Sequence, residues 1–512
     1  MAEKAKFQAI KGVRDILPPE SALWNRVEQT AQEVFGTFGF ADIRLPIFEQ
    51  AELFARSIGT DTDIVSKEMY SFEDRSWPID WPEEQADLPT FHESLVKGMA
   101  SGEIPNTKNN LAFAVALHNL YVEEAETFFQ ALSIAPQNVA AEVAKFKGQY
   151  ARLLFMARTL QLGAQLCLRP EGTASVVRAY IEHGMQVQPG NVKLYYMGPM
   201  FRREKPQKGR YRQFYQIGAE VLGTSDAPGI DAEVIEMLMM LFERLKLKGA
   251  VLNINSIGDK NCRPAYVEKL RSELQKVREQ LGPDSQRRIE TNPLRVLDSK
   301  LEHEQPIIEK LPRIAEHLCD NCREHYAEVK RQLGMRGIAY QENWRLVRGL
   351  DYYMRTTFEI TAPGLGSQNA VCGGGRYDGL VELLGGPAAT KGIGFAIGTD
   401  RLVLSLQEAG EGAAPGGLDV YLAWFGAAAQ SAAIGLARRL REASFVVELP
   451  AVEMKFGKSL GLADRLKARH AVIVGDDELA AGVVTVKRLS DGTQQKLAEA
   501  ELFSYLRAAR TA

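Results

Sequence analysis

Residues 168–173 of this chain read Leu-Arg-Pro-Glu-Gly-Thr, and residues 201–204 read Phe-Arg-Arg-Glu. The second stretch continues over residues 210–216 as Arg-Tyr-Arg-Gln-Phe-Tyr-Gln. Between Phe201 and Gln216, six cationic side chains and one acid are interleaved with aromatic residues. Cationic side chains bind phosphate oxygens and aromatic rings stack on a purine base, so a pair of strands that carries both can hold a nucleotide. The pattern indicates an enzyme that activates its substrate with a nucleotide.

Length and composition narrow the class of protein further. The chain has 512 residues, too many for a single hydrophobic core, so about two to four domains are expected. A net charge of −3 excludes a uniformly basic nucleic-acid coat but allows local basic patches. The first residues lack the apolar segment of a signal peptide, no run of about 18 apolar residues occurs, and five cysteines do not make a disulfide scaffold. These features predict a cytoplasmic protein that does not enter a membrane.

The sequence pattern of the first third of the chain predicts different kinds of structure in successive segments. Residues 38–53 alternate apolar and polar side chains around Pro46, and proline confines a strand to an edge, so an edge strand near an interface is expected. Scattered prolines predict irregular structure over 77–110, and apolar spacings of three and four predict helix over 111–163. Within it, residues 121–136 resemble one helix of a tetratricopeptide repeat, which cannot bury its own face alone. We expect a helical hairpin docked on the main body, with a partner-binding module as the alternative.

The rest of the chain alternates strand and helix patterns. These patterns predict strands at 193–200, 213–222, 353–360 and 370–374, a helix at 231–245 and a small helical insertion at 264–332. Residues 408–417 are rich in glycine and contain Pro415, which is typical of a linker. Strands and helices alternate beyond it and predict a separate α/β module of about one hundred residues.

Six blocks of sequence resemble a known family. They are Arg169-Pro-Glu-Gly-Thr173, Gly198-Pro-Met-Phe-Arg-Arg-Glu204, Gly209-Arg-Tyr-Arg-Gln-Phe214, Leu346-Val-Arg-Gly-Leu-Asp-Tyr-Tyr353, Gly373-Gly-Gly-Arg-Tyr-Asp378 and Gly394-Phe-Ala-Ile-Gly-Thr-Asp-Arg401. In this order they resemble the motifs of the histidyl-tRNA synthetases, which are class II aminoacyl-tRNA synthetases. The match covers nearly the whole chain except about residues 75–165, and other class II synthetases lack the block at 346–353.

The resemblance implies an α+β fold, with the class II antiparallel sheet and flanking helices followed by a C-terminal α/β anticodon-binding domain. The implied catalytic domain spans residues 1–405 and carries helical insertions at about 75–165 and about 259–335. A linker at 406–417 and the anticodon-binding domain at 418–512 would follow. A homodimer is also implied, with the strand around Pro46 as its dimer-forming motif.

The implied reaction joins L-histidine to ATP, releases pyrophosphate, and then transfers histidine from the adenylate to the 3′ end of tRNA(His). ATP would be a substrate, accompanied by Mg²⁺. Such chemistry needs fixed cations and positioning more than a protein base, because the attacking carboxylate is already ionised. The resemblance implies Arg202 and Arg348 as the catalytic cations. The residues that it implies for ATP are Arg202, Glu204, Arg210, Phe214 and Arg401.

A histidine site needs an acceptor for the ammonium group and polar partners for both imidazole nitrogens. By position in the family motifs, Glu171, Thr173 and Gln216 would hold the α-amino end. Glu220 and Tyr353 would bind the imidazole, with Tyr352 beside them. The full set implied for the amino acid is Glu171, Gly172, Thr173, Arg202, Gln216, Glu220, Arg348, Tyr352 and Tyr353.

Three of these features have other interpretations. Glu171 and Thr173 also suit the end of a helix, where they would cap it. Residues 373–375 are three glycines without the spacing of a phosphate loop, so we expect close backbone packing beside the substrate. Cys319 and Cys322 have the spacing of zinc ligands, with Cys262 and His325 as possible companions. One Cys-x-x-Cys pair is weak support, and no metal site is predicted.

Two rival functions remain. The first is a catalytically inactive paralogue that serves as the regulatory subunit of ATP phosphoribosyltransferase; such paralogues usually lack the anticodon domain and the 346–353 block. The second is a class II synthetase for another amino acid, against which the same block argues.

Two departures from the family pattern also matter. Asp400 stands where glutamate is usual, so the acidic role should survive. The residues at 75–165 carry seven basic and ten acidic side chains, which argues against tRNA contact there.

Overall fold

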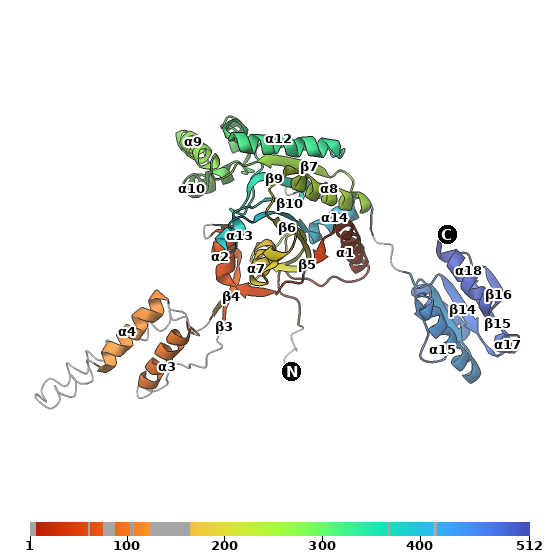
Figure 1. Cartoon of the computed structure of the whole chain (residues 1–512). Helices are drawn as coiled ribbons and strands as arrows, with labels where there is room; N and C mark the ends of the chain where they lie inside the picture. Colours follow the sequence, from red (N-terminus) through yellow and green to blue (C-terminus); the bar gives the residue numbers. More distant parts are fainter. Residues whose placement is uncertain are drawn as a thin grey trace, which may run out of the picture. The chain divides into compact units, whose positions relative to one another are not determined.

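The computed structural model describes residues 7–59, 62–74, 88–102, 104, 107–122, 164–365, 369–412 and 417–511. The chain divides into two units, one formed by residues 1–15 and 27–411 and the other by residues 16–26 and 412–512. The first unit is built on an eight-stranded sheet and the second on a five-stranded sheet (Figure 1).

The hairpin of β5 and β6 forms two neighbouring strands of the larger sheet and confirms the two strands predicted there. Across the sheet the strands run β1 (Ala41–Asp42), β5 (Val192–Phe201), β6 (Gln213–Gly223), β11 (Lys391–Gly398), β10 (Ala370–Arg376), β9 (Met354–Thr361), β7 (Val251–Ser256) and β8 (Gln341–Glu342). All neighbours from β5 to β7 are antiparallel, whereas β1 and β8 pair parallel to the strands beside them. The predicted antiparallel sheet is therefore confirmed, with a short parallel strand added at each edge.

Helices cover both faces of this sheet. They are α1 (Glu20–Thr37), α2 (Ala51–Ile58), α7 (Thr173–Glu182), α8 (Pro228–Arg244), α13 (Leu380–Leu383) and α14 (Thr399–Glu408). Successive side chains of a strand point to opposite faces. Tyr196 packs in one core with Val177 of α7, whereas Tyr195 points the other way and its ring contacts Phe35 of α1. The predicted flanking helices are thus present on each side (Figure 1).

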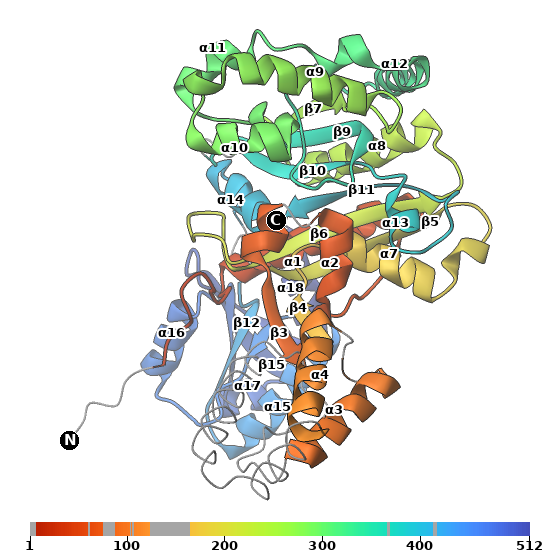
Figure 2. The same cartoon turned by 90° about the vertical axis from the view of Figure 1, so that its left-hand side faces the viewer.

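The small helical insertion lies between β7 and β8. It contains α9 (Arg263–Lys276), α10 (Pro283–Thr291), α11 (Gln305–Ile308) and α12 (Asp320–Met335). These helices lie together beyond the β7 side of the sheet (Figure 2). Their buried residues Tyr266 and Leu270 belong to the same core cluster as Tyr196 and Val177. The insertion is therefore part of the body of the first unit.

The single strand predicted at 38–53 is wrong. The sheet strand β1 ends at Asp42, β2 (Phe48–Gln50) joins a separate three-stranded sheet with β4 (Ala164–Leu168) and β3 (Tyr70–Asp74), and α2 begins at Ala51. Pro46 has no N–H to give to a ladder, so the chain leaves one sheet before it and enters another after it. The Arg169 guanidinium fastens this break, because its Nη1 donates to the carbonyls of Leu45 and Pro46 at 2.7 and 3.0 Å.

The irregular structure predicted at 77–110 is also wrong where the structure describes it, since α3 (Leu88–Ser101) lies there. Pro89 stands in the first turn of α3, where a missing N–H costs nothing. The helix predicted from residue 111 is confirmed as α4 (Lys108–Val122), which packs on α3 through the rings of Phe91 and Phe113. Most of the repeat-like stretch at 121–136 and all of 123–163 lie outside the described residues, so docking on the body stays a prediction.

The second unit has the predicted alternation of strands and helices. Its sheet runs β13 (Val447–Glu448), β12 (Val420–Trp424), β14 (His470–Val474), β15 (Val483–Arg488) and β16 (Gln494–Ala498), and its helices are α15 (Ala427–Glu442), α16 (Phe456–Arg465), α17 (Asp476–Ala480) and α18 (Glu499–Thr511). Leu436 of α15 and Leu502 of α18 share a core with Leu422, whereas Ala463 of α16 packs with Tyr421 on the other face. In the part of the chain that the structure describes, no helix is long and apolar enough to cross a membrane.

Candidate active site

A cavity of about 680 Å³ opens on the first unit, bordered by β6, β9, β10, β11 and the small helical insertion. Most of the residues predicted for the site line it. They are Glu171, Thr173, Arg202, Glu204, Arg210, Phe214, Gln216, Arg348, Tyr352, Tyr353 and Arg401. Gly172 and Glu220 do not line it but lie directly behind its wall, as described below. Residues from five separate blocks of the sequence are thus brought to one place.

The β5–β6 hairpin supplies the basic wall. Its register opposes Met200 to Phe214 and Gly198 to Gln216, and the period of two along β6 puts Phe214 and Gln216 on one face. The Arg202 guanidinium centre lies 5.3 Å from the centroid of the Phe214 ring, and its Nε donates to the Pro170 carbonyl at 2.9 Å. This hydrogen bond joins the 201–204 motif to the 168–173 motif.

Two further arginines surround the same end of the cavity. Arg210 forms an ion pair with Glu204 at 3.1 Å. Arg401, at the start of α14, donates from Nη1 to the Ala370 carbonyl at 2.9 Å and from Nε to the Gly209 carbonyl at 3.3 Å. Backbone carbonyls therefore hold the Arg401 fork in place between the hairpin loop and β10. The arrangement concentrates fixed positive charge around an aromatic ring.

Arg348 lies against the opposite strands. Its Nη1 donates to Glu359 Oε2 of β9 at 2.8 Å, while its Nε has no hydrogen-bond partner in the described structure. Glu359 and Gly373 are register partners, and a Cβ atom added at Gly373 would lie 2.1 Å from the Arg348 guanidinium. Glycine is needed at 373 because a side chain there would displace this cation. The close packing predicted for residues 373–375 is present, and Arg348 is what occupies the space.

The 168–173 motif ends at the start of α7, and Glu171 caps that helix. Its two carboxylate oxygens accept the N–H groups of Thr173 at 2.6 Å and Ala174 at 2.9 Å. Burial raises the pKa of Glu171, and the hydrogen bonds from Ala174 and Thr173 oppose that rise. The capping interpretation therefore holds in this structure, and the same carboxylate also borders the cavity. Gly172 must be small, since a Cβ atom there would lie 2.3 Å from the Tyr196 ring.

Glu220 is fully buried beneath this wall. Its two carboxyl oxygens accept hydrogen bonds, one from Thr173 Oγ1 at 2.7 Å and the other from Tyr377 Oη at 2.5 Å. Burial raises the pKa of Glu220 to about 8, although both hydroxyl donors oppose that rise. The Tyr352 ring stands beside Tyr353 and Tyr377, at centroid distances of 4.8 and 5.8 Å. Glu220 and Tyr377 thus support the lining residues Thr173 and Tyr352 from behind.

The buried Glu220 carboxyl makes stability depend on pH. In the folded protein it keeps its proton up to about pH 8, whereas its ordinary pKa is 4.5. Folding therefore takes up a proton between these values, so the contribution is most favourable at low pH and is lost as pH rises through that window. Relative to Glu220→Gln, which cannot ionise, the parent should lose about 1 kcal/mol of stability per pH unit in this window. Thermal unfolding of both proteins at several pH values tests this; a difference that does not vary with pH would contradict it.

Some lining residues were missed by the sequence reasoning. The largest group comes from the small helical insertion: Asp284, Ser285, Arg288, Arg295, Asp298, Ser299, Lys300 and Leu301. Glu359 and Cys372 also line the cavity. The composition of the insertion does not distinguish these residues from a solvated helix surface. Arg295, in the segment Asn292-Pro-Leu-Arg295, was the one available signal. Asp400, expected to keep an acidic role, accepts the N–H of Tyr215 and the Arg14 guanidinium, each at 3.1 Å.

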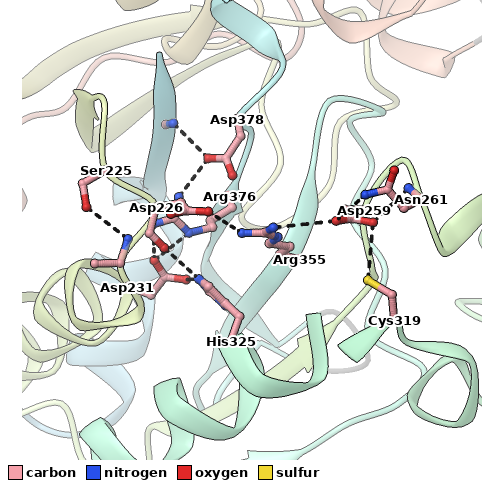
Figure 3. Close-up of polar contacts among 12 residues, drawn as sticks. Ser225, Asp226, Asp231, Asp259, Asn261, Cys319, His325, Arg355, Arg376 and Asp378 are labelled. Carbon is pink, nitrogen blue, oxygen red and sulfur yellow. Dashed lines mark hydrogen bonds and ion pairs between the residues drawn. The ribbon is translucent and has the colours of Figure 1, made fainter. Parts of the chain in front are cut away.

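Of the two companions suggested for Cys319 and Cys322, Cys262 lies beside them and His325 does not. Cys319 and Cys322 lie with Cys262 and with Asp259, which the sequence did not indicate. His325 is directed elsewhere: its Nε2 lies 3.1 Å from the Asp226 carbonyl and 3.7 Å from Asp231 (Figure 3). The expectation of no metal is not tested by this arrangement.

An antiparallel sheet that carries a basic, aromatic cavity of this kind is the arrangement expected for a class II aminoacyl-tRNA synthetase. The family model for histidyl-tRNA synthetase matches residues 144–402, and the model for the anticodon binding domain matches residues 419–509. The histidine–tRNA ligase of Koribacter versatilis is 46% identical over 505 residues, covering 98% of this chain and 96% of that protein. The ligase of Solibacter usitatus is 44% identical, with coverages of 98% and 99%.

A solved structure agrees with these relatives. The crystal structure of apo S. aureus histidyl-tRNA synthetase has a TM-score of 0.68 and 30% identity, covering 98% of this chain and 100% of that one. The chain belongs to the histidyl-tRNA synthetase family.

Proposed function

We propose that this protein activates L-histidine with ATP and transfers it to the 3′ end of tRNA(His). One observation about the site carries the proposal. Two buried polar atoms on the cavity wall, Gln216 Oε1 and Arg348 Nε, have no hydrogen-bond partner among the described residues. An orphaned acceptor suits an ammonium group and an orphaned guanidinium donor suits an anionic oxygen, as an amino acid and a phosphate would supply. The nearly full-length relatives named histidine–tRNA ligase support histidine as the amino acid.

Arg202 and Arg348 would be the catalytic cations. A carboxylate oxygen of histidine attacks the α-phosphorus of ATP, forming a new P–O bond while the bond to the leaving pyrophosphate breaks. Charge on the phosphoryl oxygens is stabilised by cations already in place, and no proton has to leave the attacking group. Arg202 approaches from the β5–β6 hairpin and Arg348 from the strands across the cavity. Glu204, Arg210, Phe214 and Arg401 would hold the rest of the nucleotide, with Phe214 under the adenine.

Mg²⁺ would accompany ATP. Carboxylate oxygens are the ligands that this ion prefers, and Glu204 and Glu359 present such oxygens on the cavity wall, so the donor set fits. Bound there, the ion would neutralise charge on the phosphates. Both carboxylates also form ion pairs with arginines, at 3.1 Å to Arg210 and 2.8 Å to Arg348. They would therefore align these cations whether or not the ion is present.

The amino acid would lie between the α7 end and the tyrosines. Glu171, Thr173 and Gln216 would face its ammonium group, with Gly172 leaving room for the wall behind them. Tyr352 and Tyr353 would contact the imidazole, and the buried Glu220 would act on it through Thr173 and Tyr377. A site that hydrogen-bonds a substrate nitrogen rejects analogues without it by about 10⁴ in favourable cases. Polar buried partners thus supply the preference for histidine.

The proposed domains separate catalysis from recognition of the anticodon. A catalytic domain at 1–405 is followed by a linker at 406–417 and an anticodon-binding domain at 418–512. The protein would act in the cytoplasm as a homodimer. The exposed side chains Ile47, Phe48 and Phe72 around the three-stranded sheet support an interface there, since a partner would bury this apolar surface.

Charging of unfractionated tRNA with labelled histidine tests the proposal against the inactive-paralogue alternative. A synthetase should form histidyl-tRNA that is destroyed by mild base and depends on ATP. A regulatory subunit of ATP phosphoribosyltransferase should form none. The presence of both the 346–353 block and a matched anticodon-binding domain favours the synthetase.

The insertion at about 75–165 should be dispensable for chemistry. It leaves the three-stranded sheet at Asp74 of β3 and returns at Ala164 of β4, and these two residues are direct register partners. A two-residue turn can therefore join the strands without strain. Replacing residues 75–163 with Asn-Gly removes the helical hairpin, including Leu117 and its packing partners. Adenylate formation should stay within about tenfold of the parent. Pyrophosphate exchange and light scattering of the variant check this; a soluble, monodisperse variant without exchange would place the insertion in the active site.

A further inference from the structure

Four potential metal ligands meet where the small helical insertion begins and ends. Asp259 and Cys262 lie between β7 and α9, whereas Cys319 directly precedes α12 and Cys322 lies in its first turn. One carboxylate oxygen and three sulfur atoms all lie within 4.8 Å of one another. None of these residues borders the active-site cavity, so the cluster is separate from the site described above.

The spacing of the atoms suits a tetrahedral ion. With zinc–sulfur bonds of about 2.3 Å, neighbouring ligands of a tetrahedral zinc lie about 3.8 Å apart. Asp259 Oδ1 lies 3.6 Å from Cys262 Sγ and 3.9 Å from Cys319 Sγ. Gly258 allows this approach, because a Cβ atom there would lie 2.7 Å from Cys262 Sγ. These two oxygen–sulfur distances are close to those between ligands of a tetrahedral site.

The surroundings suit a site with net negative charge, as three thiolates and a carboxylate around Zn²⁺ would have. Cys262 and Cys319 occupy the N-cap positions of α9 and α12, where helix dipoles favour anions. Arg355 lies 3.7 Å from Asp259 Oδ2, between Asp259 and Asp226 (Figure 3). The Asn261 N–H donates to Asp259 Oδ1 at 2.9 Å and orients the carboxylate, as outer partners of metal ligands do.

We propose that Asp259, Cys262, Cys319 and Cys322 bind one structural zinc ion that joins the two ends of the insertion. Soft thiolates select zinc over magnesium or calcium, and four protein ligands leave no open position for catalysis. Asp259, Cys262 and Cys322 are buried, and Cys319 is half-buried. The assignment replaces the histidine that the sequence suggested as a fourth ligand with Asp259.

The ion would also help to fix the backbone around Tyr353 in the active site. Arg263, which follows Cys262, donates to the Tyr353 carbonyl at 2.8 Å, and the Arg355 N–H donates to the Gly258 carbonyl at 2.7 Å. One contact is to Tyr353 itself and the other is two residues further on, and Tyr353 lines the cavity. The effect of the ion on the active site rests on the proposed function, whereas zinc binding itself does not.

The metal content of the full-length protein tests the site directly. Protein produced in zinc-containing medium and dialysed free of loose metal should hold one zinc per chain, whereas Cys262→Ser and Cys322→Ser should hold less than about a tenth. Cys167→Ala, which removes a buried cysteine outside the cluster, should keep its zinc. Cobalt exchange into the parent gives a second measurement, which does not depend on how the serine variants fold. Tetrahedral Co²⁺ bound by thiolates should show a charge-transfer band and protect three thiols from alkylation.

Several results would overturn the assignment. They are parent protein without zinc and without a cobalt–thiolate band, a Cys319–Cys322 disulfide in freshly purified protein, or loss of zinc from Cys167→Ala and the cluster variants alike. The positional part has its own readout: removing the zinc from the parent should raise the Michaelis constant for histidine several-fold more than that for ATP. Equal changes in both would leave the metal structural and remove the link to Tyr353.

Discussion

Replacing Arg348 with alanine is expected to lower histidine-dependent pyrophosphate exchange by about 10²–10³ while ATP affinity changes little. Glu359 accepts a hydrogen bond from the guanidinium at 2.8 Å, and Gly373 leaves room for it. The Nε of Arg348 has no hydrogen-bond partner among the described residues. A cation fixed in this way stabilises charge that grows in the transition state more than it stabilises bound ATP. The loss should therefore appear in the rate of the chemical step.

The substitution also leaves the Glu359 carboxylate without its partner, so controls must separate this effect. The double variant Arg348→Ala with Glu359→Gln removes both charges and should be as slow as the single variant. Arg331→Ala, which removes an exposed arginine on α12, should behave like the parent. Thermal unfolding should show that all three variants fold. Pyrophosphate exchange within about threefold of the parent in Arg348→Ala would show that its assigned role is wrong.

Deleting residues 418–512 should lower histidylation of tRNA at least a hundredfold, or about 3 kcal/mol, while histidine-dependent pyrophosphate exchange stays within about tenfold. The deleted part has its own hydrophobic core, built from β12, α15 and α18, so the first unit loses none of the cavity residues. Its thirteen basic and eleven acidic side chains nearly cancel, so contact with RNA must come from local patches.

The truncated protein should be compared with the full chain under identical salt, because phosphate contacts weaken steeply as salt rises. The parallel measurement of pyrophosphate exchange is the control, since it reports the state of the first unit in the same preparation. Charging at the efficiency of the full chain would show that residues 418–512 do not recognise tRNA.

Much of the fold followed from local pattern. The β5–β6 hairpin, α8 and the alternation beyond residue 417 were predictable because their hydrophobic periodicity is regular and agrees with the packing. The strand around Pro46 was not, since a proline can end a strand, bulge it or hand the chain to another sheet, and only the position of Arg169 decides which. The helix α3 was missed for a related reason: Pro89 reads as a breaker unless it is known to stand in the first turn.

The candidate site was predictable where motifs carry the chemistry and less so where tertiary contacts do. Arg202, Phe214 and Arg348 line one cavity as the motifs imply. Nothing local indicates that Glu220 lies behind the wall with Tyr377, because that depends on the pairing of β6 with β11 and the packing of residue 377 on Gly392. Asp259 likewise reaches the cysteines only because the insertion returns α12 to the end of β7.

Pyrophosphate exchange with each of the amino acids in turn is the most direct test of the central claim. The full-length protein, ATP, Mg²⁺ and labelled pyrophosphate are incubated with one amino acid at a time, without tRNA. We predict that histidine alone supports the exchange, and that Arg348→Ala lowers it by about 10²–10³. Exchange driven by another amino acid, or none with histidine in a folded protein that binds ATP, would contradict the account.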